Sequence, residues 1–221
     1  MPRAFVFDAY GTLFDVHTAI GRYRNEGGPD ADRISDLWRT KQLEYTWTLT
    51  LAGRYVDFWT LTERALDYAL ERFPSANKAL KPKYLDAYLT LDAFSDARET
   101  LRALKSRGLK TAILSNGTPA MLAAAVRAAK LDEAFDAVLS VDAIRMFKPR
   151  PEVYRMMTDT FSVPPGDVVF VSSNRWDVMG ARAFGCRPMW VNRAGMPEEY
   201  PDLPPQQMIR DLAALTSHSV P

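Results

Sequence analysis

The sequence has very little cysteine and histidine, and this scarcity disfavours several kinds of site. Among 221 residues there are one cysteine, Cys186, and two histidines, His17 and His218. A single cysteine cannot form an internal disulfide, and no Cys/His spacing typical of a zinc site occurs. The sequence also lacks G-x-S-x-G and G-x-G-x-x-G. These absences argue against Ser-His-Asp hydrolysis and against a classical dinucleotide site.

The sequence also lacks an excess of charge and long apolar runs. Lys and Arg together number 28 against 27 Asp and Glu, a formal net charge of +1, so no overall field favours nucleic acid or an anionic membrane. No apolar run approaches the roughly 20 residues needed to span a bilayer. The first ten residues lack the long apolar segment of a signal peptide. We therefore expect a cytoplasmic protein whose partner is a small molecule.

Short apolar runs that end in polar clusters indicate the fold class. The runs AFVF, KTAIL and DVVFV lead into Asp8, Ser115 and Ser172, and each is typical of a buried strand. Helical patterns and a fourth apolar run follow the same alternation: residues 96–108, 119–131 and 188–192. The alternation predicts an α/β fold with a Rossmann-like parallel sheet covered by helices, which binds ligands at the carboxyl ends of its strands.

From residue 15 to residue 93 this alternation stops. The segment contains helix formers and aromatic residues without a β-run, which predicts an all-helical insertion that acts as a cap over the strand ends; a plain extra helical layer is the alternative. The expected division is core at 1–14, helical cap at 15–93 and core again at 94–221. The proline-rich residues 196–208 predict an irregular connection before a short last helix.

The first two strand ends carry candidate chemistry. Asp8 follows the first strand and precedes Gly11, which permits a tight turn, so its carboxylate is a candidate covalent nucleophile or simply a helix cap. Ser115, Asn116 and Gly117 precede a predicted helix. Their hydroxyl, amide and backbone N–H groups suit an anion site, and an ordinary capping cluster explains them equally well.

Two further charged residues extend the pattern. Lys148 precedes a proline and is either solvated or, in a cleft, an ammonium group that pairs with Asp8 and keeps it ionised. Asp177 lies three residues after Asn174 at the start of a predicted helix. It either orients Lys148 and helps to activate a water, or is a first-turn acid favoured by the helix dipole.

The order of these clusters along the chain resembles that of the haloacid dehalogenase superfamily. The four family motifs are matched by DAYGTLFD, LSNG, KPRPEVY and SSNRWD, and the resemblance covers essentially the whole chain. Most members are magnesium-dependent phosphatases whose first motif reads Asp-x-Asp. Here Tyr10 stands in place of the second aspartate, and residues 172–174 are Ser-Ser-Asn where further acids are expected. Because Mg²⁺ requires hard, preferably anionic oxygen ligands, these two losses disfavour a phosphatase.

The sequence is similar to one branch in particular, the type II (S)-2-haloacid dehalogenases. A halide leaves as a stable anion without protonation, so this chemistry needs neither the second aspartate nor a metal. Arg39, Leu43 and Phe58 match cap residues of that branch; as isolated features they are also compatible with cap core and surface. The resemblance implies attack by Asp8 on C2 of a short (S)-2-haloalkanoic acid, an aspartyl ester, and hydrolysis to the (R)-2-hydroxyalkanoic acid.

The resemblance also assigns residues and partners. The implied catalytic set is Asp8, Thr12, Arg39, Ser115, Lys148, Tyr154, Ser172, Asn174 and Asp177. The implied substrate- and halide-binding set is Tyr10, Gly11, Arg39, Leu43, Phe58, Asn116 and Trp176. Small haloacid, water and halide ion are the implied partners, with no metal or organic cofactor and a homodimeric assembly. Two alternatives remain: a phosphatase or phosphonatase of the same superfamily, and a non-catalytic small-anion binding protein on the same fold.

Overall fold

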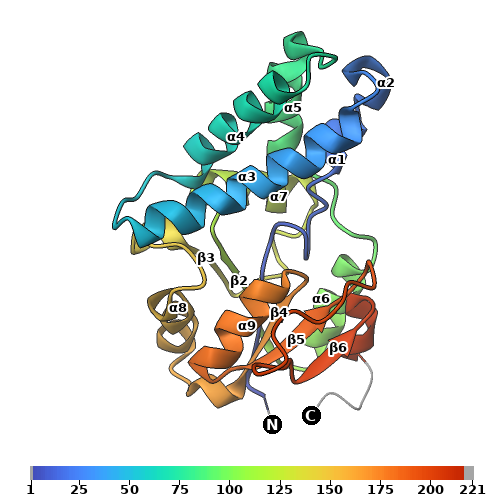
Figure 1. Cartoon of the computed structure of the whole chain (residues 1–221). Helices are drawn as coiled ribbons and strands as arrows, with labels where there is room; N and C mark the ends of the chain where they lie inside the picture. The colour runs from blue at the N-terminus through green and yellow to red at the C-terminus, as the bar shows by residue number, and fades with distance from the viewer. Residues whose placement is uncertain (1, 217–221) are drawn as a thin grey trace.

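A parallel sheet forms the centre of the protein. The computed structural model describes residues 2–216, and its six strands run in the order β3-β2-β1-β4-β5-β6, with every neighbouring pair parallel (Figure 1). The strands span β1 Ala4–Phe7, β2 Lys110–Ser115, β3 Ala137–Ser140, β4 Val168–Ser172, β5 Arg187–Val191 and β6 Gln207–Ile209. This arrangement confirms the predicted α/β class.

The apolar composition of β1 explains its central position. All four of its residues are buried, and a strand that is apolar throughout is stable only where both faces of the sheet are covered. Phe7 is in register with Ile113 on one side and Val171 on the other, and the Asp8 N–H donates to Val171 O at 2.9 Å. The carboxyl ends of β1, β2 and β4 therefore lie side by side at one edge of the sheet.

Helices flank both faces of this sheet (Figure 1). The core helices are α6 Ala97–Ser106, α7 Pro119–Ala128, α8 Pro151–Phe161 and α9 Arg175–Phe184, with 3₁₀ turns η2 Val141–Ala143, η3 Pro165–Asp167 and η4 Leu212–Thr216. Sequence signals fix their ends. The Thr118 hydroxyl accepts from the Met121 N–H at 3.3 Å at the start of α7, and α6 stops before Gly108, which has a φ of +74°.

A helical cap lies over the carboxyl ends of the strands (Figure 1). Its elements are α1 Thr18–Gly21, α2 Arg24–Gly27, α3 Ala31–Leu51, α4 Phe58–Arg72, η1 Lys78–Leu80 and α5 Lys81–Leu89. Trp38 of α3 donates its indole N–H to Thr62 O of α4 at 2.8 Å, which joins the two longest cap helices. The two chain crossings between cap and core pair with each other, because Phe94 N donates to Leu13 O at 2.9 Å.

Three details differ from the sequence-based expectations. The stretch 196–208 is irregular up to its last two residues, which begin strand β6 beside β5. The edge strand β3 was not predicted, because only four residues take part and three of them are incompletely buried. Helix α7 ends at Ala128 rather than continuing to residue 131. His218 lies outside the described residues. Within residues 2–216, no helix is both long and apolar enough to cross a membrane.

Candidate active site

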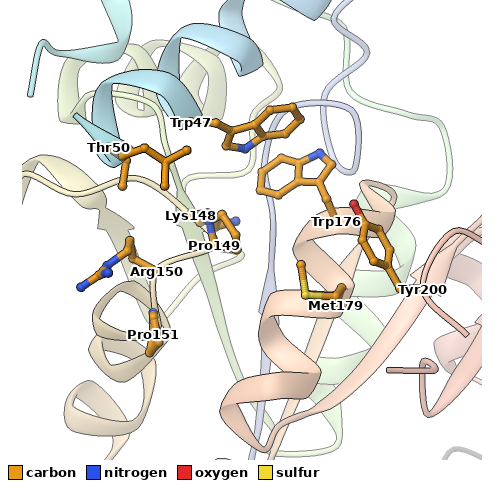
Figure 2. A pocket seen from close by; sticks show the side chains of 10 residues that line it. Trp47, Thr50, Lys148, Pro149, Arg150, Pro151, Trp176, Met179 and Tyr200 are labelled. Carbon is orange, nitrogen blue, oxygen red and sulfur yellow. The ribbon is translucent and has the colours of Figure 1, made fainter. Parts of the chain in front are cut away.

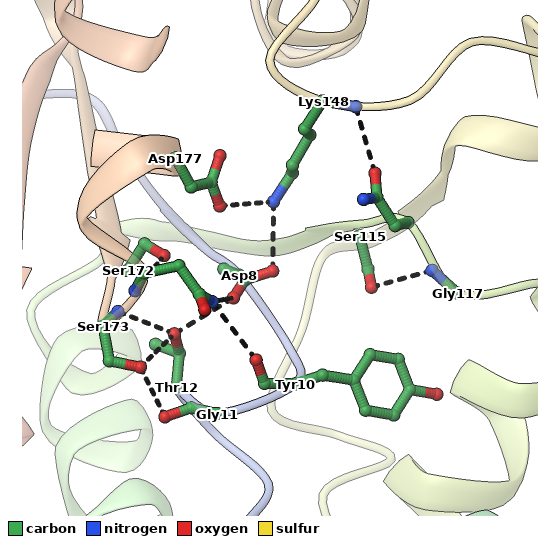
Figure 3. Close-up of polar contacts among 12 residues, drawn as sticks. Asp8, Tyr10, Gly11, Thr12, Ser115, Gly117, Lys148, Ser172, Ser173 and Asp177 are labelled. Carbon is green, nitrogen blue, oxygen red and sulfur yellow. Dashed lines mark hydrogen bonds and ion pairs between the residues drawn. The ribbon is translucent and has the colours of Figure 1, made fainter. Parts of the chain in front are cut away.

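Asp8 lies at the centre of a buried hydrogen-bonded cluster at the carboxyl end of β1 (Figure 3). Its Oδ1 atom lies 3.1 Å from Lys148 Nζ. Its Oδ2 atom accepts from the Thr12 hydroxyl at 3.1 Å and from the Asn174 amide at 2.7 Å. Only 9% of the Asp8 side chain is exposed. Both carboxylate oxygens are thus oriented by donors, and the side chain is held in one rotamer at the end of the strand.

Lys148 bridges two carboxylates. Its ammonium lies 2.8 Å from Asp177 Oδ2 as well as 3.1 Å from Asp8, and its side chain is only 1% exposed. Burial lowers the pKa of Lys148, but the charges of Asp177 and Asp8 and their hydrogen bonds outweigh this effect and raise the pKa above its usual value. Lys148 is therefore a fixed positive charge beside the candidate nucleophile.

Asp177 is completely buried behind Lys148. The Tyr154 hydroxyl donates to Asp177 Oδ1 at 2.7 Å, so each carboxylate oxygen has a donor. Burial raises the pKa of Asp177 to about 6 and the charge of Asp8 adds to this rise, while Lys148 and Tyr154 oppose it. Burial also raises the pKa of Tyr154 well above its usual value. Tyr154 thus remains a proton donor to Asp177 at neutral pH.

The loop after β4 supports the loop after β1. The Ser173 N–H donates to Thr12 Oγ1 at 2.9 Å, and the Ser173 hydroxyl donates to Gly11 O. The Asn174 N–H donates to Ser172 Oγ at 3.1 Å. Ser173 was missing from the predicted set, although it lies within the polar cluster at this strand end. Its contacts join different strand ends, and only the strand order of the sheet reveals them.

One expected backbone donor is already occupied. Gly11 has a φ of +90° and donates its N–H to Phe14 O at 2.7 Å. This N–H therefore serves the tight turn itself, and a role for Gly11 in substrate binding stays a prediction. Gly11 supports the site through its left-handed conformation and its carbonyl.

The end of β2 supplies two further buried polar side chains. Ser115 Oγ accepts from the Gly117 N–H at 3.1 Å, which leaves the hydroxyl hydrogen for another acceptor. Asn116 Oδ1 accepts from the Lys148 N–H at 3.1 Å, which leaves its NH₂ group as a donor. Helix α7 begins just beyond them. This arrangement suits an anion better than a cation.

The cap contributes one cation to the site. Arg39 of α3 donates through Nη2 to Tyr10 O at 3.1 Å and to Asn174 Oδ1 at 3.3 Å. Phe58 of α4 lies against Tyr10, with ring centroids 5.9 Å apart, and Leu43 lies one helical turn after Arg39. The Tyr10 ring points away from Asp8 (Figure 3). Tyr10 Oη is buried without a hydrogen-bond partner among the described residues.

An apolar chamber of about 360 Å³ lies next to this cluster, between α3, α9 and the segment that precedes α8 (Figure 2). Trp47 of the cap meets Trp176 of the core edge to face, with centroids 5.4 Å apart. Lys148 and Met179 also line the chamber, whereas Leu43 and Phe58 do not. Of the residues expected to bind substrate and halide, Trp176 lines this chamber.

Comparison with known proteins agrees with this geometry. The family model described as "haloacid dehalogenase-like hydrolase" matches residues 2–185. The chain belongs to this family. Over 214 residues it is 50% identical to (S)-2-haloacid dehalogenase 1 of Pseudomonas sp. (strain CBS-3), covering 96% of this chain and 94% of that protein.

Solved structures of this hydrolase family extend the likeness to three dimensions. A dehalogenase structure with an intermediate complex is 47% identical, with a TM-score of 0.95 over 97% of this chain and 95% of that one. The L-2-haloacid dehalogenase of Xanthobacter autotrophicus with chloropropionic acid covalently bound is 38% identical, with a TM-score of 0.87 over 98% and 97%. The resemblance inferred from the four motifs is confirmed.

Proposed function

We propose that this haloacid dehalogenase-like hydrolase converts short (S)-2-haloalkanoic acids into (R)-2-hydroxyalkanoic acids through an ester on Asp8, without a metal or organic cofactor. The observation that carries the proposal is the bridge of Lys148 between Asp8 and Asp177. A carboxylate paired with a fixed cation and oriented by two further donors is suited to act as an ionised nucleophile. The dehalogenase relatives and the structure with a covalently bound chloropropionic acid support the same chemistry.

In the first step an Asp8 oxygen attacks C2 of the substrate from the side opposite the halogen. The new C–O bond forms as the carbon–halogen bond breaks with its electron pair, so the configuration at C2 inverts and halide leaves as a stable anion. The Arg39 guanidinium, the Asn116 amide and the Trp176 ring edge would surround the departing halide. Because halide needs no proton, this reaction does not require the second aspartate that Tyr10 replaces.

Binding brings a carboxylate substrate to a carboxylate nucleophile, and like charges at contact distance repel strongly where water is excluded. Two cations, Arg39 and Lys148, offset this repulsion. The Ser115 hydroxyl, whose hydrogen is not used in its bond with the Gly117 N–H, and the beginning of α7 would bind the substrate carboxylate. Fixing the carboxylate in this way holds C2 in line with Asp8.

In the second step water attacks the carbonyl carbon of the Asp8 ester. The negative charge that develops on the carbonyl oxygen lies within reach of Lys148, which would stabilise it as an oxyanion-hole donor does. Collapse of this intermediate expels the hydroxyacid oxygen, which takes up one proton of the attacking water, and regenerates the Asp8 carboxylate as the other proton passes to solvent. Thr12, Ser172, Asn174, Tyr154 and Asp177 act by holding Lys148 and the water; most of their contacts are within this cluster.

The remaining features of the proposal concern the whole chain. We assign residues 1–14 and 94–221 to the core and 15–93 to the cap, a division supported by the pairing of Leu13 and Phe94 at the crossing. The partners are a small haloacid, water and halide, without nucleic acid or membrane. A cytoplasmic homodimer is consistent with the single cysteine and with Leu51 of the cap, which is 89% exposed.

The rival functions fit the cluster less well. A magnesium-dependent phosphatase needs carboxylates free to bind the ion, whereas Lys148 engages both Asp8 and Asp177. Within residues 2–216, no three His, Cys, Asp or Glu side chains gather in a way that would hold a metal ion. A non-catalytic binding protein would need only an anion pocket and not an oriented nucleophile. Neither rival accounts for the full set of contacts around Asp8.

The deciding experiment measures halide release from (S)-2-chloropropionate in EDTA by the purified protein. (R)-2-Chloropropionate and p-nitrophenyl phosphate with Mg²⁺ serve as parallel substrates, and Asp8→Asn as the matched variant. We expect halide release from the (S) acid alone and none from Asp8→Asn. Hydrolysis of the phosphate ester without dehalogenation would support the phosphatase, and binding of haloacid without turnover would support the binding protein.

A further inference from the structure

Three buried polar side chains form a chain of hydrogen bonds inside the cap. Gln42 of α3, Thr62 of α4 and Tyr88 of α5 are each no more than 1% exposed. Gln42 Nε2 donates to Thr62 Oγ1 at 2.9 Å, and the Tyr88 hydroxyl donates to Gln42 Oε1 at 3.4 Å. Buried amides and hydroxyls are costly unless they are paired, so such a chain in a small helical cap calls for an explanation.

The donors and acceptors in this chain all point in one direction. The Thr62 hydroxyl donates to Phe58 O at 2.7 Å, so its oxygen must accept from the Gln42 amide nitrogen. The Gln42 oxygen is then turned toward Tyr88 and accepts the phenolic hydrogen. Because that hydrogen is committed, the Tyr88 oxygen presents only lone pairs to any other neighbour.

The neighbour on that side is Arg39. The Tyr88 ring stacks on the Tyr10 ring at 5.5 Å with an interplanar angle of 22°, and Arg39 donates to the Tyr10 carbonyl. Burial raises the pKa of Tyr88, while the charge of Arg39 opposes that rise. The phenol thus stays neutral, and its bond to Gln42, three residues after Arg39 on the same helix, places its oxygen beside Arg39.

We propose that Tyr88 and Gln42 are positioning residues for Arg39: their ordered hydrogen bonds hold the guanidinium over the Tyr10 carbonyl and Asn174, where it meets the departing halide. The role of Arg39 toward halide rests on the proposed function, whereas the positioning of Arg39 by Tyr88 and Gln42 does not. Arg39 is a long side chain with many rotamers. Its contacts with Tyr10 and Asn174 both use Nη2, so its guanidinium has further N–H groups to donate to an acceptor in the cap. An acceptor fixed inside the cap removes that freedom before substrate arrives.

The test compares Tyr88→Phe with Tyr84→Phe. Tyr84 is also on α5, one turn earlier, and is equally buried, but it packs against Tyr23 and not against Tyr10. For Tyr88→Phe we expect kcat to fall and the inhibition constant for bromide to rise, each by about tenfold, as for the loss of one hydrogen bond to a charged group. Tyr84→Phe should change neither by more than about twofold.

Two further measurements separate a positioning role from general damage to the cap. Gln42→Met should reproduce the Tyr88→Phe effect, and the double variant should be no worse than Tyr88→Phe alone because both act through Arg39. Additive losses of kcat in the double variant would contradict a shared action of Gln42 and Tyr88 through Arg39. Crystal structures of wild type and Tyr88→Phe supply a readout independent of activity: we expect the contact between Arg39 Nη2 and Tyr10 O to be lost in the variant.

An Arg39 side chain unmoved in Tyr88→Phe would overturn the inference even in an active enzyme. Equal effects of Tyr88→Phe and Tyr84→Phe on bromide inhibition would overturn it as well. If the wild type releases no halide from any (S)-2-haloacid, the proposed function fails, and the crystallographic comparison still decides whether Tyr88 positions Arg39.

Discussion

The ammonium group of Lys148 lies 3.1 Å from the Asp8 carboxylate, and both side chains are almost completely buried. The two residues are 140 positions apart in the sequence, and β1 and the segment before α8 bring them together. Asp177 contacts the same ammonium from the other side. Lys148 therefore lies between two carboxylates, and its positive charge offsets the repulsion between Asp8 and Asp177.

Replacing Lys148 should abolish turnover. In Lys148→Gln the oxyanion formed during ester hydrolysis loses its charged donor, and we expect kcat to fall by at least about 10²-fold to 10³-fold. Steady-state halide release from (S)-2-chloropropionate measures this loss. Lys110→Gln is the control, because Lys110 is an exposed lysine that pairs with Asp136. A Lys148→Gln enzyme with near-normal kcat would contradict the assigned role.

The same substitution should destabilise the protein in a pH-dependent way. Without Lys148, the two buried carboxylates face each other without a positive charge between them. Removing one partner of a buried ion pair costs about 3 to 5 kcal/mol of stability. Protonation of Asp177, whose pKa is raised by burial, relieves this cost, so the loss should be larger at pH 8 than at pH 5. Urea unfolding of wild type and Lys148→Gln at the two pH values measures the difference. A larger loss of stability at pH 5 than at pH 8 would contradict this account.

Tyr154→Phe should move the acid limb of the activity profile. The ionised form of Asp177 holds Lys148, and the pKa of Asp177 near 6 implies that kcat declines below that pH. The Tyr154 hydrogen bond lowers this pKa, so its removal raises it, and we expect the limb to shift upward by about one pH unit. Profiles of kcat from pH 4.5 to 9, with Tyr84→Phe as control, test this. A downward shift would contradict the assignment.

Gly180 offers a steric test of the same residues. A Cβ atom added there would lie 2.4 Å from Tyr154 Oη and 2.7 Å from Pro149 Cβ, so Gly180→Ala must displace the side chain that holds Asp177. We expect at least about a tenfold fall in kcat with the same upward shift of the acid limb. Gly166→Ala is the control because its added Cβ meets nothing within 4 Å. Unchanged kinetics in Gly180→Ala would show that Tyr154 tolerates displacement.

Much of the fold and the site could be predicted because the signals are local. A buried strand followed by a turn and a polar cluster occurs at Asp8, Ser115 and Ser172, and parallel strands bring such ends to one edge. Arg39, by contrast, was assigned through a family resemblance, since nothing in its helix indicates that its guanidinium reaches Tyr10 O.

What escaped prediction depends on contacts distant in sequence. Ser173 was overlooked because its partner Thr12 is 161 residues away. Gln42 and Tyr88 appear as ordinary cap residues until three helices are assembled around them. The turn after β1 uses the Gly11 N–H internally, and only the folded turn reveals this contact. The short strands β3 and β6 owe their conformation to sheet neighbours more than to their own sequences.

The central claim is that an Asp8 oxygen, and not water, attacks C2 of the substrate. Multiple turnovers in H₂¹⁸O, followed by mass spectrometry of the peptide that contains Asp8, test it most directly. We expect ¹⁸O to accumulate in the Asp8 carboxylate, because water attacks the ester carbonyl in each cycle and the hydroxyacid then leaves with an oxygen taken from Asp8. An unlabelled Asp8 peptide with fully labelled product from the first turnover would contradict the account.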